Sequence, residues 1–206
     1  MTVAAHPASV THKMTFEEFL EWDDEGAHAE WVDGEVEVMS PASYAHQNLI
    51  SFLVSLLRFL AEARELGDVL CQPFVMKTGH DLPGREPDIL FIAAVNLSRI
   101  QRNYLDGPAD LAIEIVSPES QRRDREVKLE EYRQGGVPEY WLLDPTRNEA
   151  IFRQLQPDGT YRIVVPDAEG VYHSAAMPGL WINVNWLWQS PLPTLLYVFR
   201  QWGLLN

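Results

Sequence analysis

The sequence predicts an α/β (α+β) fold in which one mixed β-sheet is flanked by helices. Three observations support this expectation: helical apolar spacing at residues 44–66, several short apolar or alternating segments typical of strands, and a second helical segment at 117–136 between strands. The length of 206 residues suits one compact domain with a substantial core. Residues 1–13 have no hydrophobic periodicity, so we expect them to form a flexible N-terminal tail. The rest of the sequence has no internal repeat or linker, so we expect a single domain over 14–206.

The first expected elements are a short helix and a β-hairpin. In the segment 14–22, Thr15 and Glu18 have the spacing of a capping box, which indicates the start of a helix. The segment 29–40 contains two short alternating runs around an Asp-Gly pair, a sequence typical of a two-residue hairpin turn. A helix followed by a hairpin is therefore predicted before the long helix.

The long helix and the first strands of the sheet come next. Leucine and phenylalanine recur along 44–66 at intervals of three and four, which predicts one amphipathic helix packed on a sheet. Extended segments follow around 69–77 and 88–94, joined by a stretch rich in turn-forming residues. Residues 110–117 form another short apolar segment, and we expect it to be a buried strand.

The C-terminal part begins with the second helical segment. Over 117–136, Ser117 or Ser120 can cap the start of a helix, and Gly135 or Gly136 can end it. Three strands are then predicted, at 139–144, 149–155 and 160–165. A segment rich in tryptophan and proline closes the chain.

Composition bounds the compartment and the partners. The lone cysteine, Cys71, excludes an intramolecular disulfide and fits a reducing compartment. The first ten residues lack the basic and apolar regions of a signal peptide, and polar residues and prolines interrupt the apolar tract 179–200. We expect a cytoplasmic protein with no membrane partner. The formal net charge of −14 disfavours a broad nucleic-acid surface, so nucleic-acid binding would require a local basic patch.

Three residues stand out as candidates for chemistry. Asp88 follows a proline at the head of a strand, Glu114 lies in the middle of the apolar strand LAIEIV, and Lys128 lies on the helix after it. Each has an ordinary explanation: a turn aspartate, a glutamate on the half-exposed face of a strand, and a solvated helix lysine. Sequence position alone does not separate these explanations from a site.

Taken together, the two carboxylates indicate a cation site. Carboxylates on neighbouring strands repel each other unless a divalent cation lies between them. Oxygen ligands with open positions filled by water suit Mg²⁺, which also binds substrate phosphates. Phosphodiester hydrolysis needs an activated water and stabilised negative charge, and a metal with a lysine can supply both.

An ordered series of short motifs resembles a known family. The chain is similar to the Uma-two family of restriction endonucleases in EWVDGE (30–35), His46, PD (87–88), IEIVSPES (113–120), Asp124 and Lys128 as D-x-x-x-K, Tyr132, GVPEYWLLDP (136–145) and PGLWINVNWLW (178–188). The resemblance covers nearly the whole chain past residue 13. It implies a restriction endonuclease-like PD-(D/E)XK core.

The resemblance also implies roles for individual residues. In this superfamily the lysine usually lies two residues after the strand carboxylate, but that position is Val116 in this chain. Lys128 matches members whose lysine has moved onto the following helix. Glu30 matches an upstream acid that completes the acidic cluster, and His46 matches a position that could orient water or phosphate. The alternatives are an exposed hairpin residue for Glu30 and a polar helix-start residue for His46.

A modest basic patch follows the candidate strand. Arg122, Arg123 and Arg125 lie at the start of the second helix, and Arg85 precedes the Pro-Asp pair. These arginines could contact phosphates near a helix N-terminus. The alternative is an ordinary salt-bridged helix face, because acidic residues alternate with them. We therefore expect weak, salt-sensitive DNA binding.

The leading hypothesis is a Mg²⁺-dependent DNA endonuclease, with Mn²⁺ as a possible substitute. Asp88, Glu114 and the Ile115 carbonyl are the expected metal ligands, with Lys128 placing or activating the attacking water. A second hypothesis is a catalytically inert nuclease-fold module that binds a protein or itself, anchored by tryptophans of the C-terminal segment. A third is hydrolysis of another phosphodiester, such as RNA. A homodimer is expected only by analogy with nucleases that cut two strands.

Overall fold

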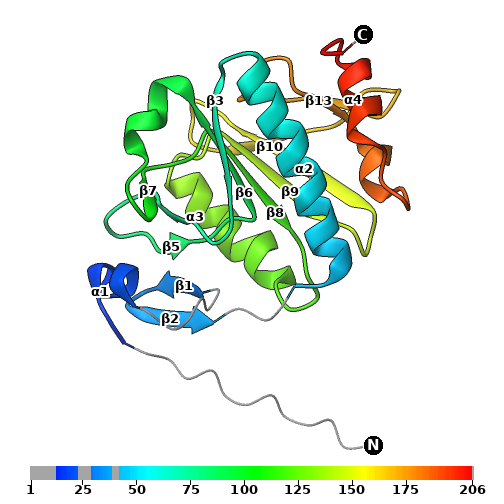
Figure 1. Cartoon of the computed structure of the whole chain (residues 1–206). Coiled ribbons are helices and arrows are strands. Elements are labelled where there is room, and N and C mark those ends of the chain that lie inside the picture. Colours follow the sequence, from blue (N-terminus) through cyan, green and yellow to red (C-terminus); the bar gives the residue numbers. More distant parts are fainter. Residues whose placement is uncertain (1–12, 23–28, 39–41, 206) are drawn as a thin grey trace, which may run out of the picture.

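The computed structural model describes residues 13–22, 29–38 and 42–205 (Figure 1). A six-stranded mixed sheet forms its centre, in the order β11-β10-β9-β8-β6-β3. Its strands are β3 (Gly67–Cys71), β6 (Ile89–Ala93), β8 (Leu111–Ile115), β9 (Glu139–Asp144), β10 (Glu149–Leu155) and β11 (Tyr161–Val164). β8 and β9 are parallel, and the other neighbouring pairs are antiparallel. The predicted mixed sheet flanked by helices is confirmed.

The long helix α2 (Tyr44–Ala63) covers one face of this sheet. Ser43 caps its N-terminus by accepting a hydrogen bond from the backbone of His46 at 3.2 Å. The leucines that recur at helical spacing are buried against apolar side chains of β6, β8 and β9. Burial of this stripe fixes the N-terminal end of α2 beside the start of β6 and the end of β8, since these two strands are antiparallel (Figure 1).

The second helix covers the opposite face and departs from regular α-helix. A π-helical stretch, Arg123–Val127, precedes α3 (Lys128–Gln134). The backbone N–H of Lys128 donates to the carbonyl of Arg123, and the Asp124 carbonyl instead accepts the Tyr140 hydroxyl of β9 at 2.8 Å. The helix was expected over 117–136, but residues 118–120 form a turn and helical structure begins at Gln121. Such π-turns widen a helix locally and are frequent at functional sites.

A second sheet has the order β2-β1-β5-β4-β7, and its β1–β2 hairpin lies below the central sheet in Figure 1. It contains β1 (Ala29–Val32), β2 (Glu35–Val38), β4 (Val75–Lys77), β5 (Gly84–Arg85) and β7 (Tyr104–Asp106). The helix α1 (Phe16–Glu21) starts with the predicted capping box, and the β1–β2 hairpin turns at the predicted Asp-Gly pair. Phe19 of α1 packs with Val36 and Val75 in a small core of its own.

Several expectations need correction. The segment 69–77 is not one extended strand, because β3 and β4 belong to different sheets. The strands β5 and β7 and the 3₁₀ helix Ala94–Arg99 were not predicted. Of the tail expected at 1–13, only Lys13 lies within the described residues, and it forms a β-bridge with Glu35.

The C-terminal segment is ordered and packs on the core. It contains β12 (Val171–His173), β13 (Trp181–Asn183), the 3₁₀ helix Val184–Trp188 and α4 (Leu195–Gln201). Trp186 and Trp202 are buried, and Trp181 and Trp188 pack against the same core cluster as α2. These tryptophans therefore help to cover the core. No helix in the described part of the chain has both the length and the apolar character needed to cross a membrane.

Candidate active site

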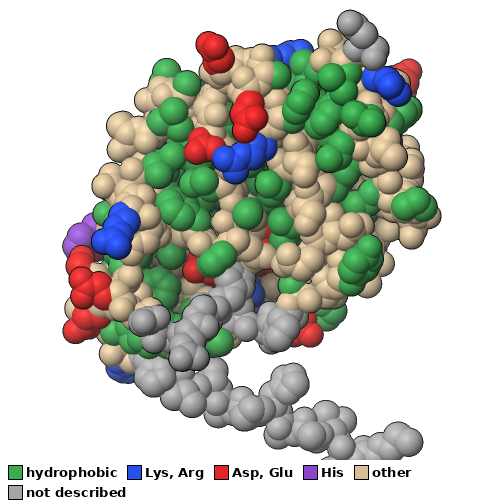
Figure 2. Space-filling view, in the orientation of Figure 1, with side chains coloured by type: hydrophobic (Ala, Val, Ile, Leu, Met, Phe, Trp, Pro, Cys, Tyr) green, Lys and Arg blue, Asp and Glu red, His purple; other side chains and the backbone are tan. Residues whose placement is uncertain are grey.

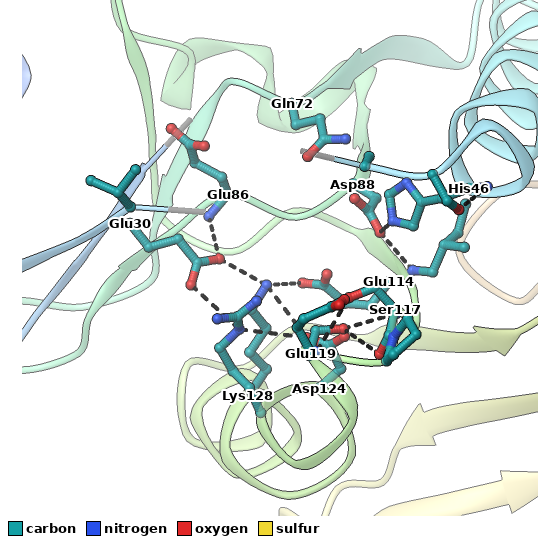
Figure 3. Close-up of a pocket in the computed structure, with 17 residues that line it drawn as sticks. Glu30, His46, Gln72, Glu86, Asp88, Glu114, Ser117, Glu119, Asp124 and Lys128 are labelled. Carbon is teal, nitrogen blue, oxygen red and sulfur yellow. Dashed lines mark hydrogen bonds and ion pairs between the residues drawn. The ribbon is translucent and has the colours of Figure 1, made fainter. Parts of the chain in front are cut away.

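One cavity brings the candidate residues together. It has a volume of about 320 Å³ and lies where the N-terminus of α2, the head of β6, the end of β8 and the π-turn before α3 meet. Its walls include Asp88, Glu114, Lys128, Glu30 and His46. Figure 3 shows these side chains pointing toward one another across the cavity. The convergence joins residues that are up to 98 positions apart in the chain, Glu30 and Lys128.

Glu114 lies at the centre of this arrangement and is only 3% exposed. The half-exposed strand considered from the sequence is wrong, because Ala112 and Val116 on the same face are buried too. The Lys128 ammonium and the Tyr132 hydroxyl donate to Glu114 Oε1 at 3.0 and 2.6 Å. Burial raises the pKa of Glu114 to about 8; Lys128 opposes this shift, and the neighbouring carboxylates add to it.

Lys128 points into the cavity and not into solvent. Its Nζ lies 2.8 Å from Glu30 Oε1, 3.0 Å from Glu114 Oε1 and 3.7 Å from Asp124 Oδ1. Burial alone would lower the pKa of Lys128, but the three carboxylates outweigh it and raise the pKa. The side chain is therefore a fixed ammonium, suited to placing groups and stabilising negative charge rather than to accepting a proton.

Glu30 reaches the cavity from the hairpin and is held there by two cations. Its Oε1 meets Lys128, and its Oε2 accepts from the Arg85 guanidinium at 2.9 Å. Arg85 also makes two hydrogen bonds to Glu131 of α3, both at 2.7 Å. Burial would raise the pKa of Glu30, but Lys128, Arg85 and Arg123 together lower it to about 2. Glu30 is thus a permanent carboxylate, and the exposed hairpin residue considered from the sequence is wrong.

Asp88 and His46 form the other end of the cavity. The Asp88 carboxylate accepts the Ile115 backbone N–H at 2.6 Å, and His46 Nε2 lies 3.3 Å from the same oxygen. Burial lowers the pKa of His46, but hydrogen bonding and charge from Asp88 and the Ile115 backbone raise it overall. His46 therefore orients Asp88 and faces the backbone of Ile115, the two groups proposed from the sequence as metal ligands.

Asp124 is a further carboxylate of the cavity that was not selected as a site residue. It is 2% exposed, and its Oδ1 lies 3.7 Å from Lys128 and 3.9 Å from Arg123. Burial raises the pKa of Asp124. The D-x-x-x-K spacing could have identified Asp124 as a site residue, because positions four apart lie on one face of a helix and Lys128 was already a candidate. Tyr132, which holds Glu114, was noted only as part of a motif.

The arginines of the expected basic patch do not act as one surface. Arg123 lines the cavity, whereas Arg122 is exposed and lies 3.5 Å from Glu126. Arg125 contacts Asp144 and Glu149, each at 2.6 Å, outside the cavity. Arg85 is 3% exposed and cannot lie on a phosphate-binding rim. On the face that carries α2, Figure 2 likewise shows isolated Lys and Arg side chains among the described residues.

The donor set of the cavity fits a hard divalent cation. Glu30, Asp88, Glu114 and Asp124 share this cavity with two further acidic residues, Glu86 and Glu119, and repulsion from the charges of Glu30, Asp88 and Asp124 contributes to the raised pKa of Glu114. A cation relieves such repulsion, and Mg²⁺ commonly uses one or two protein carboxylates plus water. Among the described residues, no group of three or more His, Cys, Asp or Glu side chains is arranged as a metal cage. Asp88 and Glu114 therefore fit as a two-carboxylate set completed by water.

The fold of this protein is shared with a solved structure that is described as a nuclease. The structure matches the crystal structure described as a "putative nuclease belonging to DUF820" from Anabaena variabilis ATCC 29413. The TM-score is 0.69 at 16% identity, and the match covers 85% of this chain and 97% of that one. At this identity the match establishes that the two proteins share a fold.

A family profile then identifies the chain more narrowly. The Uma2 family, described as "Putative restriction endonuclease", matches residues 16–185. The chain belongs to the Uma2 family. Among curated proteins, no sequence matches it. The family and the fold support a nuclease function.

Proposed function

We propose that this protein is a divalent-cation-dependent DNA endonuclease whose reaction centre is the cavity between α2, β6, β8 and α3. The observation that carries the proposal is the convergence of Asp88, Glu114 and Lys128 with Glu30 in one buried cluster. Burial of several carboxylates around a lysine ammonium carries a large desolvation penalty. Such clusters of buried ionisable groups are typical of functional sites. Hydrolysis of a phosphodiester is the chemistry that this set and the family support together.

The chain's own residues have distinct tasks in this proposal. Asp88, Glu114 and the Ile115 carbonyl would hold Mg²⁺ or Mn²⁺, and His46 keeps Asp88 oriented. The cation would supply Lewis acidity toward a phosphoryl oxygen and lower the pKa of a bound water. Lys128 places its ammonium beside Glu114 and stabilises the negative charge that develops at the phosphorus oxygens. Glu30, locked by Arg85, keeps that ammonium in position.

Plasmid cleavage tests the proposal directly. Supercoiled DNA incubated with the purified protein should be nicked in Mg²⁺ or Mn²⁺ and left intact in EDTA. Absence of nicking in both metals, with a folded protein that binds neither ion at millimolar concentration, would overturn it. That result would favour the inert module that binds a protein or another copy of itself. Parallel reactions on single-stranded RNA of matched length distinguish DNA from RNA as the substrate.

Substrate binding should depend on Arg123 and not on Arg125. Arg123 lines the cavity and is 29% exposed in its side chain, whereas Arg125 is paired with Asp144 and Glu149. Arg123→Gln should lower DNA affinity and reduce the slope of log affinity against log salt by about one. Arg125→Gln is the matched control on the same helix and should leave that slope unchanged. Fluorescence anisotropy over a salt series measures both, and equal slopes for the two variants would contradict the assignment.

A further inference from the structure

We propose that this site takes up one divalent cation and not two, because the Lys128 ammonium occupies the place of a second cation. The inference rests on the proposed metal-dependent function and specifies the stoichiometry of its site. Six acidic residues line the cavity, and the charges of three of them, Glu30, Asp88 and Asp124, act on a fourth, Glu114, so the number of carboxylates in this donor set alone would not exclude a second cation. Two-metal nuclease centres hold their ions about 3.5–4 Å apart between shared carboxylates.

The contacts of Lys128 show which part of this donor set is already used. Its Nζ lies within 3.0 Å of Glu30 and Glu114 and 3.7 Å from Asp124. An ammonium has three donors and no acceptor; Glu30 and Glu114 lie within hydrogen-bond distance of it, and Asp124 lies at ion-pair distance. Lys128 thus compensates the charge of three of these carboxylates, those of Glu30, Glu114 and Asp124. A metal ion in that position would have to displace a buried side chain that is paired with three carboxylates.

Glu30 is withdrawn from metal binding by its other contacts as well. Its Oε2 accepts from Arg85 at 2.9 Å, and its Oε1 also accepts the Glu86 backbone N–H at 3.3 Å. Both oxygens are therefore engaged by protein donors. Since Arg85 is itself clamped to α3 through Glu131, Glu30 cannot turn toward a cation without breaking several buried contacts.

The opposite end of the cavity has a different character. Asp88 lies away from Lys128, and its side-chain partners are the backbone of Ile115 and the His46 ring. Figure 3 shows Glu114 between these two ends, with Glu30 and Lys128 on one side and Asp88 and His46 on the other. The end at Asp88 is the one where a cation can add charge compensation. One divalent ion between Asp88 and Glu114, next to one ammonium, gives the centre three positive charges in total.

Counting bound Mn²⁺ tests this inference without reference to cleavage. Electron paramagnetic resonance of free Mn²⁺, confirmed by calorimetry, should give one ion per wild-type chain. Lys128→Met removes the ammonium at similar side-chain length, and this variant should bind two ions per chain. Lys77→Met is the matched control, because Lys77 is also buried but its amine contacts the His80 carbonyl and the Trp31 ring outside this cavity. The control should bind one ion.

The outcomes separate the two levels of the proposal. Two ions in the wild type overturn the inference and leave the metal-dependent function standing, and this measurement needs no variant to fold. One ion in a folded Lys128→Met, as judged by circular dichroism and a cooperative melt, also overturns it. Binding of no ion by the wild type contradicts the proposed function itself.

Discussion

Replacement of Glu114 with glutamine is expected to reduce Mg²⁺-dependent plasmid cleavage by about a thousandfold. Glutamine has nearly the same shape, but its neutral amide offers a cation one carbonyl oxygen and no charge. The ammonium of Lys128 keeps Glu30 and Asp124 as partners, so the loss arises at the cation and not from collapse of the cluster. Single-turnover conversion of supercoiled to nicked plasmid measures the effect.

The same substitution is expected to keep or raise the stability of the metal-free protein. The folded-state pKa of Glu114 is about 8, above its ordinary value of 4.5, so near neutral pH folding must take up a proton there. Since a raised acid pKa makes folding less favourable as pH rises from 4.5 toward 8, a neutral side chain removes that penalty. Urea unfolding at pH 7.5 should therefore show no loss for Glu114→Gln.

An exposed residue provides the control for this experiment. Glu126 lies on the same helical segment as Lys128, and its side chain is 69% exposed beside Arg122. Glu126→Gln should cleave at the wild-type rate within about twofold, because isolated surface pairs contribute little. Cleavage by Glu114→Gln at a rate near that of the control would show that Glu114 does not hold the cation.

The elements of the fold were predictable where local pattern determines them. The helix α2 follows from its leucine spacing, and the β1–β2 hairpin follows from its Asp-Gly turn. Alternation also placed Glu114 on one face of β8 with Ala112 and Val116. What alternation could not show is that α3 covers this face, since burial of a strand on both sides depends on a helix distant in the chain.

The cluster around Glu114 was only partly predictable for a related reason. Glu30 lies 84 positions before Glu114, and no local spacing indicates that Arg85 would hold it against Lys128. The placement of Asp124 depends on a π-turn whose carbonyl is bound by Tyr140, a residue of the next strand. These contacts join residues that are far apart in the sequence. The series of motifs therefore indicated which residues belong to the site, but the distances between their side chains could not be predicted without the structure.

The arginines illustrate the limit of charge patterns. In the sequence Arg85, Arg123 and Arg125 look alike, as basic residues near a candidate site. In the structure Arg85 forms ion pairs with Glu30 and Glu131. Arg125 forms ion pairs with Asp144 and Glu149. Of these three arginines, only Arg123 lines the cavity. Whether a basic side chain is available for phosphate depends on acidic partners that sequence proximity does not reveal.

The largest expected effect on stability belongs to a carboxylate outside the cavity, that of Glu139. It is fully buried at the start of β9 and accepts five hydrogen bonds. The donors are Trp141 Nε1 (2.6 Å), the Tyr172 hydroxyl (2.8 Å), Ser174 Oγ (3.1 Å) and the backbone N–H groups of Ala175 and Ala176 (2.8 Å each). This one side chain therefore attaches the segment that follows β12 to the central sheet.

Glu139→Leu should lower the free energy of unfolding by about 4 kcal/mol or more, because it leaves several buried donors without an acceptor. Glu139→Gln keeps one acceptor oxygen and should recover part of that loss. Glu169→Leu is the control, since Glu169 is an exposed acidic residue of the same C-terminal region, and it should change stability by less than about 0.5 kcal/mol. Urea denaturation followed by tryptophan fluorescence measures all three. A loss for Glu139→Leu no larger than that of the control would mean that apolar packing, and not this carboxylate, holds the C-terminal segment on the sheet.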